Sequence, residues 1–181
     1  MTDAIALFRR PFYFLRHGET ELNAQKRIAG SVDTGLTALG RRQALEAADA
    51  LADEPITAVY SSAMRRARDT AEPIAARLKL PVTVIAELDE RNWGALEGEP
   101  RDSRVRGVEP EGAEAFEDFE RRVLAGFARI DSPVPLIVGH SGVYRVLCRA
   151  LALVETDGPV ENCRALRIAP RTGGGWQVKL A

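Results

Sequence analysis

The chain has 181 residues, of which 45% are hydrophobic, 28% charged and 6% aromatic. This composition is typical of a globular protein and argues against a disordered, collagen-like or coiled-coil chain. Its 25 basic side chains balance 26 acidic ones, for a net charge of −1. Charge therefore gives no reason to expect a nucleic-acid or membrane partner. The length predicts a single domain over residues 1–181.

The ends and the cysteines of the chain indicate its expected compartment. Residues 1–10 form an N-terminal extension that lacks the basic start and cleavage site of a signal peptide. Apolar runs such as 133–138 are too short to cross a bilayer. The two cysteines, Cys148 and Cys163, are too few for a disulfide scaffold and lack metal-ligand spacing. We therefore expect a cytoplasmic protein with reduced thiols.

Strand-like apolar runs alternate with helix-like spacings along the chain. Helices are predicted over 37–54, 64–78, 116–130 and 143–151, with Thr37 as the N-cap of the first. Strands are predicted at 12–15, 56–60, 82–85 and 136–138, followed by two short strands around the Gly-rich turn 173–175. This order predicts an α/β fold, a three-layer α/β/α sandwich with a mainly parallel central sheet. Residues 91–112 have no clear period and are predicted to be a short cap or loop excursion.

Both histidines of the chain follow predicted strands. His17 comes after the strand at 12–15, His140 comes after the strand at 136–138, and each lies next to a glycine. In open α/β sheets, ligands bind outside the carboxyl ends of the strands. The two histidines are therefore expected at a functional site.

The residues around these histidines favour an anion over a metal ion. With a carboxylate such as Glu90, His17 and His140 would supply the three protein ligands of a catalytic zinc site. However, Arg16 precedes His17, and two consecutive arginines, at positions 65 and 66, follow the second predicted strand. Clustered cations oppose a divalent metal, and guanidinium groups match the geometry of phosphate. We therefore prefer a phosphate site and expect no metal.

Two further features of the sequence bear on such a site. At about 100° per residue, only one of Arg65 and Arg66 can point into a site above the sheet. The first turn of their helix also offers unpaired N–H groups to an anion. Several carboxylates follow the third strand within 88–98, and one beside a bound phosphate would be able to protonate a leaving oxygen.

Four motifs in this order resemble those of the histidine phosphatase superfamily, in its phosphoglycerate mutase-like branch. The similarity covers roughly residues 11–169, and each motif comes after a predicted strand. Met64 stands where the family usually has Leu. The alignment selects Arg66, not Arg65, as the guanidinium that points inward. The four motifs are Arg16–Thr20 with Asn23, Ser62–Ala71, Leu88–Gly98 and Gly139–Gly142.

The resemblance implies a role for each matched residue. His17 would be the nucleophile and would carry a phosphohistidine intermediate. Glu90 would protonate the leaving alkoxide and then take a proton from the attacking water. No metal or cofactor is implied, because side chains would supply the positive charge. The phosphoryl oxygens would be held by Arg16, Asn23, Arg66, His140 and Ser141.

The predicted function is therefore that of a metal-independent phosphatase acting on small phosphomonoesters. A phosphoglycerate mutase-type phosphotransferase is disfavoured by the short cap, since a mutase must keep its bisphosphate intermediate away from water. A phosphoprotein or phosphohistidine phosphatase would suit an open site. A non-catalytic phosphate-binding regulatory protein is disfavoured because all five catalytic positions are present. The short cap carries three arginines that would either touch the substrate or be solvated: Arg101, Arg104 and Arg106. A homodimer is one candidate assembly.

Overall fold

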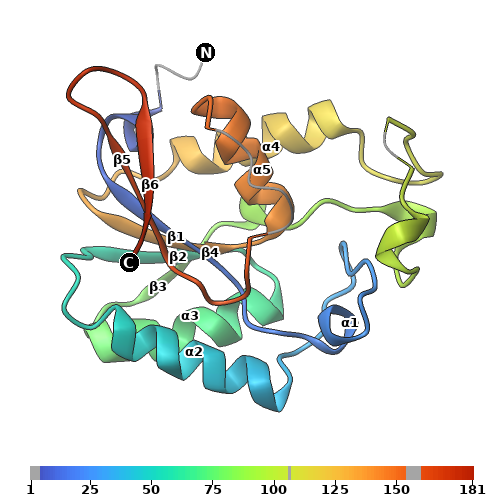
Figure 1. Ribbon diagram of the computed structural model, residues 1–181, viewed down its shortest axis with the longest axis horizontal. Helices are drawn as coiled ribbons and strands as arrows, with labels where there is room; N and C mark the ends of the chain where they lie inside the picture. Colours follow the sequence, from blue (N-terminus) through green and yellow to red (C-terminus); the bar gives the residue numbers. More distant parts are fainter. Residues whose placement is uncertain (1–4, 106, 154–159) are drawn as a thin grey trace.

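A computed structural model describes residues 5–105, 107–153 and 160–181 (Figure 1). Its six strands form one sheet in the order β3-β2-β4-β1-β5-β6. Strands β1 (Phe12–Arg16), β2 (Ala58–Ser61), β3 (Val82–Val84) and β4 (Pro135–Gly139) are parallel to one another. Strands β5 (Leu166–Pro170) and β6 (Trp176–Leu180) add an antiparallel hairpin at one edge. The predicted mainly parallel sheet is confirmed.

Helices cover both faces of the sheet, so the predicted three-layer sandwich is also confirmed (Figure 1). Helices α2 (Ala38–Ala50) and α3 (Arg65–Leu78) lie on one face, and α4 (Phe116–Ala128) and α5 (Ser141–Ala150) lie on the other. The single-turn helix α1 (Glu21–Ala24) follows β1. Of the helices in the described ranges, none combines the length and apolarity that a bilayer crossing requires.

Each face of the sheet has its own hydrophobic core because successive side chains of a strand point in opposite directions. In β1, Tyr13 and Leu15 join the core beneath α2 and α3, whereas Phe12 and Phe14 join the core beneath α4 and α5. Every residue of β1 and β4 is buried, as expected for central strands covered on both faces. The carboxyl ends of these two strands are therefore held rigidly.

Helix α2 shows where local signals set the boundaries and where a prediction was wrong. Thr37 is its N-cap, as predicted, and its Oγ1 accepts a hydrogen bond from the Gly40 N–H at 2.9 Å. The helix ends at Ala50 rather than near residue 54. Pro55 keeps Glu54 out of the helix, because a proline disfavours helical geometry in the residue before it.

Residues 91–112 contain only short 3-10 helices among the described positions, η4 (Gly94–Leu96) and η5 (Arg101–Ser103), after η3 (Ala86–Leu88). Main-chain hydrogen bonds tie this excursion to residues 26–28. The Gly98 N–H donates to the Ile28 carbonyl, and the Ile28 N–H donates to the Glu99 carbonyl. Gly94 has φ +54°, and a Cβ there would lie 2.1 Å from the Glu111 carbonyl oxygen. A glycine is therefore required at that turn.

Residues 5–9 pack onto the same body as the sheet and helices. Within the predicted extension 1–10, residues 1–4 lie outside the described ranges. A short 3-10 helix, η2 (Ala6–Arg9), follows them. Ile5 and Leu7 are buried in the core beneath α4 and α5.

Candidate active site

Parallel pairing of β1 with β4 brings the two histidines together although they are far apart in the sequence. Arg16 is the register partner of Gly139, and the His17 N–H donates to the Gly139 carbonyl at 3.0 Å. The ring centroids of His17 and His140 are 5.2 Å apart. Both imidazoles are buried, with 4% and 0% of their residue surfaces exposed. The carboxyl ends of the two central strands thus form the floor of a candidate site.

The hydrogen bond of His17 fixes its tautomer. Its Nδ1 lies 2.7 Å from the Gly18 carbonyl oxygen, which can only accept, so Nδ1 carries the proton and Nε2 keeps its lone pair. Burial lowers the pKa of His17 well below its ordinary value, and the charges of Arg66 and Arg16 lower it further. His17 is therefore neutral at pH 7, the form in which Nε2 can act as a nucleophile.

His140 is held at the start of α5, where it is the N-cap residue. Its Nε2 lies 2.7 Å from Ser62 Oγ, at the end of the neighbouring strand β2. Burial lowers the pKa of His140 well below its ordinary value, and Arg66 and His17 contribute in the same direction. Its buried Nδ1 has no hydrogen-bond partner among the described residues.

Two buried guanidinium groups complete the floor. Arg66, 1% exposed, donates from Nη1 to the Val32 carbonyl and from Nη2 to the Gly30 carbonyl, both at 2.7 Å. Arg16, 6% exposed, donates from Nη1 to the Val160 carbonyl at 2.8 Å. Neither forms an ion pair with a carboxylate within the described ranges. Their charges are thus oriented by neutral carbonyls and are available to an anion.

Burial controls the charge state of these two arginines without removing the charge. It lowers the pKa of Arg16 to about 10, and the nearby Arg101 contributes to that shift. It also lowers the pKa of Arg66. The carboxylate of Glu90 opposes the shift at both groups. Arg16 therefore remains protonated at pH 7.

Three of the four buried side-chain polar atoms that lack a hydrogen-bond partner among the described residues belong to the candidate site. The fourth atom is Thr34 Oγ1. Because almost all buried polar groups in proteins are hydrogen-bonded, each exception needs an explanation. An anion with several oxygens, bound between the strand ends, would satisfy the nitrogens of the set. The other three atoms are Arg16 Nε, Arg66 Nε and His140 Nδ1.

The structure separates Arg65 from Arg66 in the way that the motif alignment predicts. Arg65 is exposed and pairs with Asp69 one helical turn later, at 3.4 Å. Its backbone N–H is capped by Asp33. Arg66 instead points inward, to the carbonyl groups of residues 30 and 32.

Of the carboxylates after β3, Glu90 lies against α5 at the floor. Its Oε2 accepts from the Gly142 N–H at 3.0 Å, and its Oε1 accepts from the Arg91 N–H at 2.9 Å. A Cβ on Gly142 would lie 2.1 Å from Glu90 Oε1, so a glycine is needed for this approach. Asp89 is used differently: its Oδ1 accepts from the Ala63 N–H at 2.7 Å.

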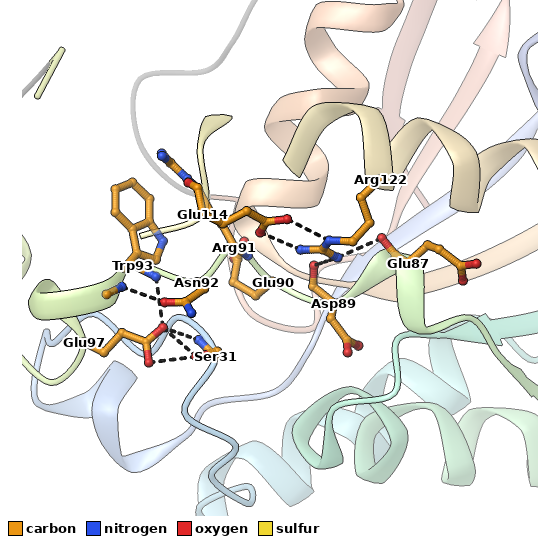
Figure 2. Close-up of polar contacts among 11 residues, drawn as sticks. Ser31, Glu87, Asp89, Glu90, Arg91, Asn92, Trp93, Glu97, Glu114 and Arg122 are labelled. Carbon is orange, nitrogen blue, oxygen red and sulfur yellow. Dashed lines mark hydrogen bonds and ion pairs between the residues drawn. The ribbon is translucent and has the colours of Figure 1, made fainter. Parts of the chain in front are cut away.

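Glu97 serves to hold the excursion. It accepts hydrogen bonds from the Ser31 N–H at 2.6 Å and from the Trp93 N–H at 3.0 Å (Figure 2). In the same excursion, Arg104 stacks over Trp93 with its guanidinium carbon 4.2 Å from the ring centroid. Arg101 lies close enough to Arg16 to affect its pKa, and Arg106 lies outside the described residues.

The remaining predicted phosphate ligands, Asn23 and Ser141, flank the floor. Asn23 Oδ1 accepts from the Thr20 N–H and from Asn162 Nδ2, both at 3.3 Å, which leaves its Nδ2 group as the donor for a ligand. Ser141 is the first residue of α5, and its N–H is one of the donors that a helix start leaves unpaired.

Sequence reasoning missed two residues that orient the site. Ser62 holds the His140 ring, and its position inside the second motif was an available signal. Asn162 donates from Nδ2 to the His17 carbonyl at 2.6 Å and also contacts Asn23. No motif or spacing marks Asn162, because only the return of the chain beside β1 places it there.

Within the described ranges, no cluster of three or more His, Cys, Asp or Glu side chains is arranged to hold a metal ion.

These features define the class of protein: an α/β fold with a buried histidine pair at its strand ends and, beside it, two buried guanidinium groups that form no ion pair among the described residues, an arrangement suited to a phosphoryl group. The family model of the histidine phosphatase superfamily (branch 1) matches residues 12–181. The chain therefore belongs to this superfamily, and the resemblance inferred from the motifs is confirmed.

Named relatives support a phosphatase function and a phosphoric monoester hydrolase activity. The chain is 33% identical over 162 residues to "Uncharacterized phosphatase PhoE" of Bacillus subtilis, covering 85% of this chain and 81% of that protein. It is 33% identical over 196 residues to "Probable phosphoglycerate mutase GpmB" of Yersinia pestis, covering 93% and 91%. Three mycobacterial relatives are 38% identical over 162 residues, and the match spans 44% of their length.

A solved structure agrees with the fold. A mycobacterial glucosyl-3-phosphoglycerate phosphatase, in complex with VO3, superposes with a TM-score of 0.79 at 27% identity. The superposition covers 94% of this chain and 98% of that protein.

Proposed function

We propose that this protein is a metal-independent phosphatase that hydrolyses small phosphomonoesters through a phosphohistidine on His17. The observation that carries the proposal is the set of buried, unpartnered nitrogens around a neutral histidine whose Nε2 is free. The names of the relatives, a phosphatase and a glucosyl-3-phosphoglycerate phosphatase, support the same reaction and a small substrate.

In the first step, His17 Nε2 attacks phosphorus as the bond to the leaving oxygen breaks. Glu90 in its acid form gives its proton to that oxygen, so the alcohol leaves neutral and the phosphoryl group stays on Nε2. Charge spreads over the three equatorial oxygens in such a transition state. Arg16 and Arg66, with His140, would stabilise that charge without rearrangement, because they are already held in place.

In the second step, a water molecule attacks the phosphohistidine. The Glu90 carboxylate, left by the first step, takes a proton from this water. The bond between phosphorus and Nε2 breaks, inorganic phosphate leaves, and His17 returns to its neutral form. One carboxyl group thus acts as acid and then as base, and both protons are accounted for.

A second candidate is phosphoglycerate mutase-type transfer, which the Yersinia relative favours by its name. The excursion 91–112 opposes it, because its described residues form only two short 3-10 helices. A mutase must keep its phosphoenzyme and bisphosphate away from water. We expect hydrolysis to dominate; efficient, bisphosphate-stimulated interconversion of 2- and 3-phosphoglycerate would establish the mutase instead.

Trapping the intermediate tests the proposed function. The protein is incubated with a 32P-labelled phosphomonoester and a chelator, then quenched without acid, which would hydrolyse a phosphohistidine. We expect the label on His17, and no label in His17→Ala. Label on Ser61, Ser62 or Cys148 would contradict the mechanism, and binding of phosphate without turnover would support the regulatory alternative.

We also propose that the protein is cytoplasmic, as the sequence predicts, and that it forms the homodimer that is one candidate assembly. Cell fractionation tests the first. Light scattering on the purified protein tests the second, and a monomer at micromolar concentration would contradict it.

A further inference from the structure

A network of polar contacts from α4 holds the segment that carries Glu90 (Figure 2). We propose that Arg122, fixed by Glu114, is a positioning residue that sets the place of the Glu90 carboxyl for proton transfer. This inference rests on the proposed function, in which Glu90 is the acid and then the base.

Arg122 binds the main chain directly before Glu90. Its Nη1 donates to the carbonyl oxygens of Glu87 and Asp89, each at 3.0 Å. The Asp89 carbonyl belongs to the peptide bond that contains the Glu90 nitrogen. A displacement of the Arg122 guanidinium would therefore move the backbone from which the Glu90 side chain projects.

Glu114 fixes the plane of that guanidinium. Arg122 Nε donates to one carboxylate oxygen of Glu114 at 2.9 Å, and Nη2 donates to the other at 2.8 Å. Such a two-pronged pair specifies orientation as well as attraction. The pair leaves Nη1 facing the two carbonyl groups. The Phe119 ring lies beside the guanidinium, with its centroid 5.2 Å from the guanidinium carbon.

The main chain of Glu114 holds the other side of the same segment. Its carbonyl accepts from Arg91 Nε at 2.8 Å, and its N–H donates to the Asn92 carbonyl at 3.0 Å. Arg122 thus binds the main chain at positions 87 and 89, before Glu90. The main chain of Glu114 binds positions 91 and 92, after it. Figure 2 shows the contacts of Arg122 with Glu114 and with the carbonyl groups of residues 87 and 89.

The pair is suited to orient Glu90 rather than to supply stability alone. Both partners are partly exposed, with 28% and 21% of their side-chain surfaces accessible, so solvent screens part of their mutual attraction. Proton transfer, in contrast, is sensitive to distance: a misplacement of about 1 Å can cost about 100-fold in rate. Loss of Arg122 should therefore reproduce, in weaker form, the kinetic signature of losing Glu90.

The signature is a dependence on the leaving group. An alkyl phosphate needs a proton on its leaving oxygen, whereas nitrophenolate leaves without one. Arg122→Lys keeps the charge but lacks the fork, so we expect about 10- to 100-fold slower turnover of glycerol phosphate. The phosphohistidine burst with p-nitrophenyl phosphate should change only a few-fold. Combined with Glu90→Gln, the substitution should add almost nothing further, because both act through one carboxyl group.

Arg121→Lys is the matched control, since Arg121 is the preceding residue of α4, is exposed and pairs only with Asp118 among the contacts described for it. It should leave both substrates unaffected. Glu114→Gln is the milder second variant if Arg122→Lys folds poorly, and we expect a smaller loss with the same leaving-group pattern.

Equal losses with both substrates, or full additivity with Glu90→Gln, would overturn the inference while leaving the phosphatase intact. Failure of the wild-type protein to label His17 would instead remove the proposed function. Hydrogen exchange of the peptide 86–93 then tests, independently of catalysis, whether the Arg122–Glu114 pair holds this segment. Faster exchange in Arg122→Lys than in Arg121→Lys supports it, and unchanged exchange contradicts it.

Discussion

The floor of the candidate site and the excursion 91–112 lie next to each other but are held by different interactions. The floor sits at the ends of β1 and β4, whose residues are all buried between two helical layers. The excursion is tied by main-chain hydrogen bonds to residues 26–28 and by exposed contacts such as Ser31 with Glu97. The charged groups of the candidate site thus lie at the ends of fully buried strands, whereas the excursion is a surface segment held by main-chain and exposed side-chain contacts.

The largest effect should come from the floor, at Arg66. Arg66→Ala removes a buried cation of the proposed phosphate site and should lower kcat/KM by about 100- to 1,000-fold. Arg65→Ala, the matched control, removes an exposed charge paired with Asp69 and should be nearly silent. Steady-state kinetics on p-nitrophenyl phosphate measure both, with thermal unfolding as a check of folding. Equal losses from the two variants would mean that the helix register at the site differs from the one described.

Glu90 stands where the floor meets the excursion, and its loss should be next in size. Glu90→Gln keeps the shape of the side chain and removes the carboxyl group proposed to donate the proton. Hydrolysis of an alkyl phosphate should slow by about 100-fold or more. The burst of phosphohistidine formation from p-nitrophenyl phosphate should slow much less. If both substrates lose the same factor in rapid-quench experiments, Glu90 positions the phosphate or Arg66 instead, and Asp89 becomes the next candidate for the acid.

The buried histidines should make stability fall on mild acidification. Burial lowers the pKa of His17 and His140 in the folded state, so the unfolded chain binds more protons below its histidine pKa of about 6.5. Unfolding free energy should therefore fall between pH 7.5 and 5.5, by about 1 kcal/mol per histidine.

Urea unfolding at the two pH values measures this loss. His17→Gln with His140→Gln should flatten the difference, provided that the variant folds. A pH dependence of the same size in that double variant would assign the effect to groups outside the floor.

The excursion should give the smallest effect. Ser31→Ala removes the hydroxyl that contacts both oxygens of Glu97 at 2.9 Å. The contact is exposed, and the Ser31 N–H bond to Glu97 is retained, so stability should change by about 0.5 kcal/mol or less. Turnover of p-nitrophenyl phosphate should stay within about two-fold. A loss as large as that of Arg66→Ala would show that the excursion fixes the site as strongly as the floor does.

The sequence by itself determined the elements and the chemistry of their ends. Local periodicity placed the strands and helices, because burial repeats every two residues in a strand and every 3.6 in a helix. The same reading placed His17 and His140 directly after strands. The family motif, not the spacing, chose Arg66 over Arg65.

Only the tertiary structure decided which of these ends meet and what holds them. That β1 lies beside β4 depends on the order of strands across the sheet, which no local pattern encodes. Arg16 and Arg66 are aimed by the carbonyls of Val160, Gly30 and Val32. Backbone carbonyls are the same in every residue, so the sequence carries no mark of those that hold a guanidinium. For the same reason, only the tertiary structure identifies the hydrogen bonds from Arg122 to the carbonyl groups before Glu90.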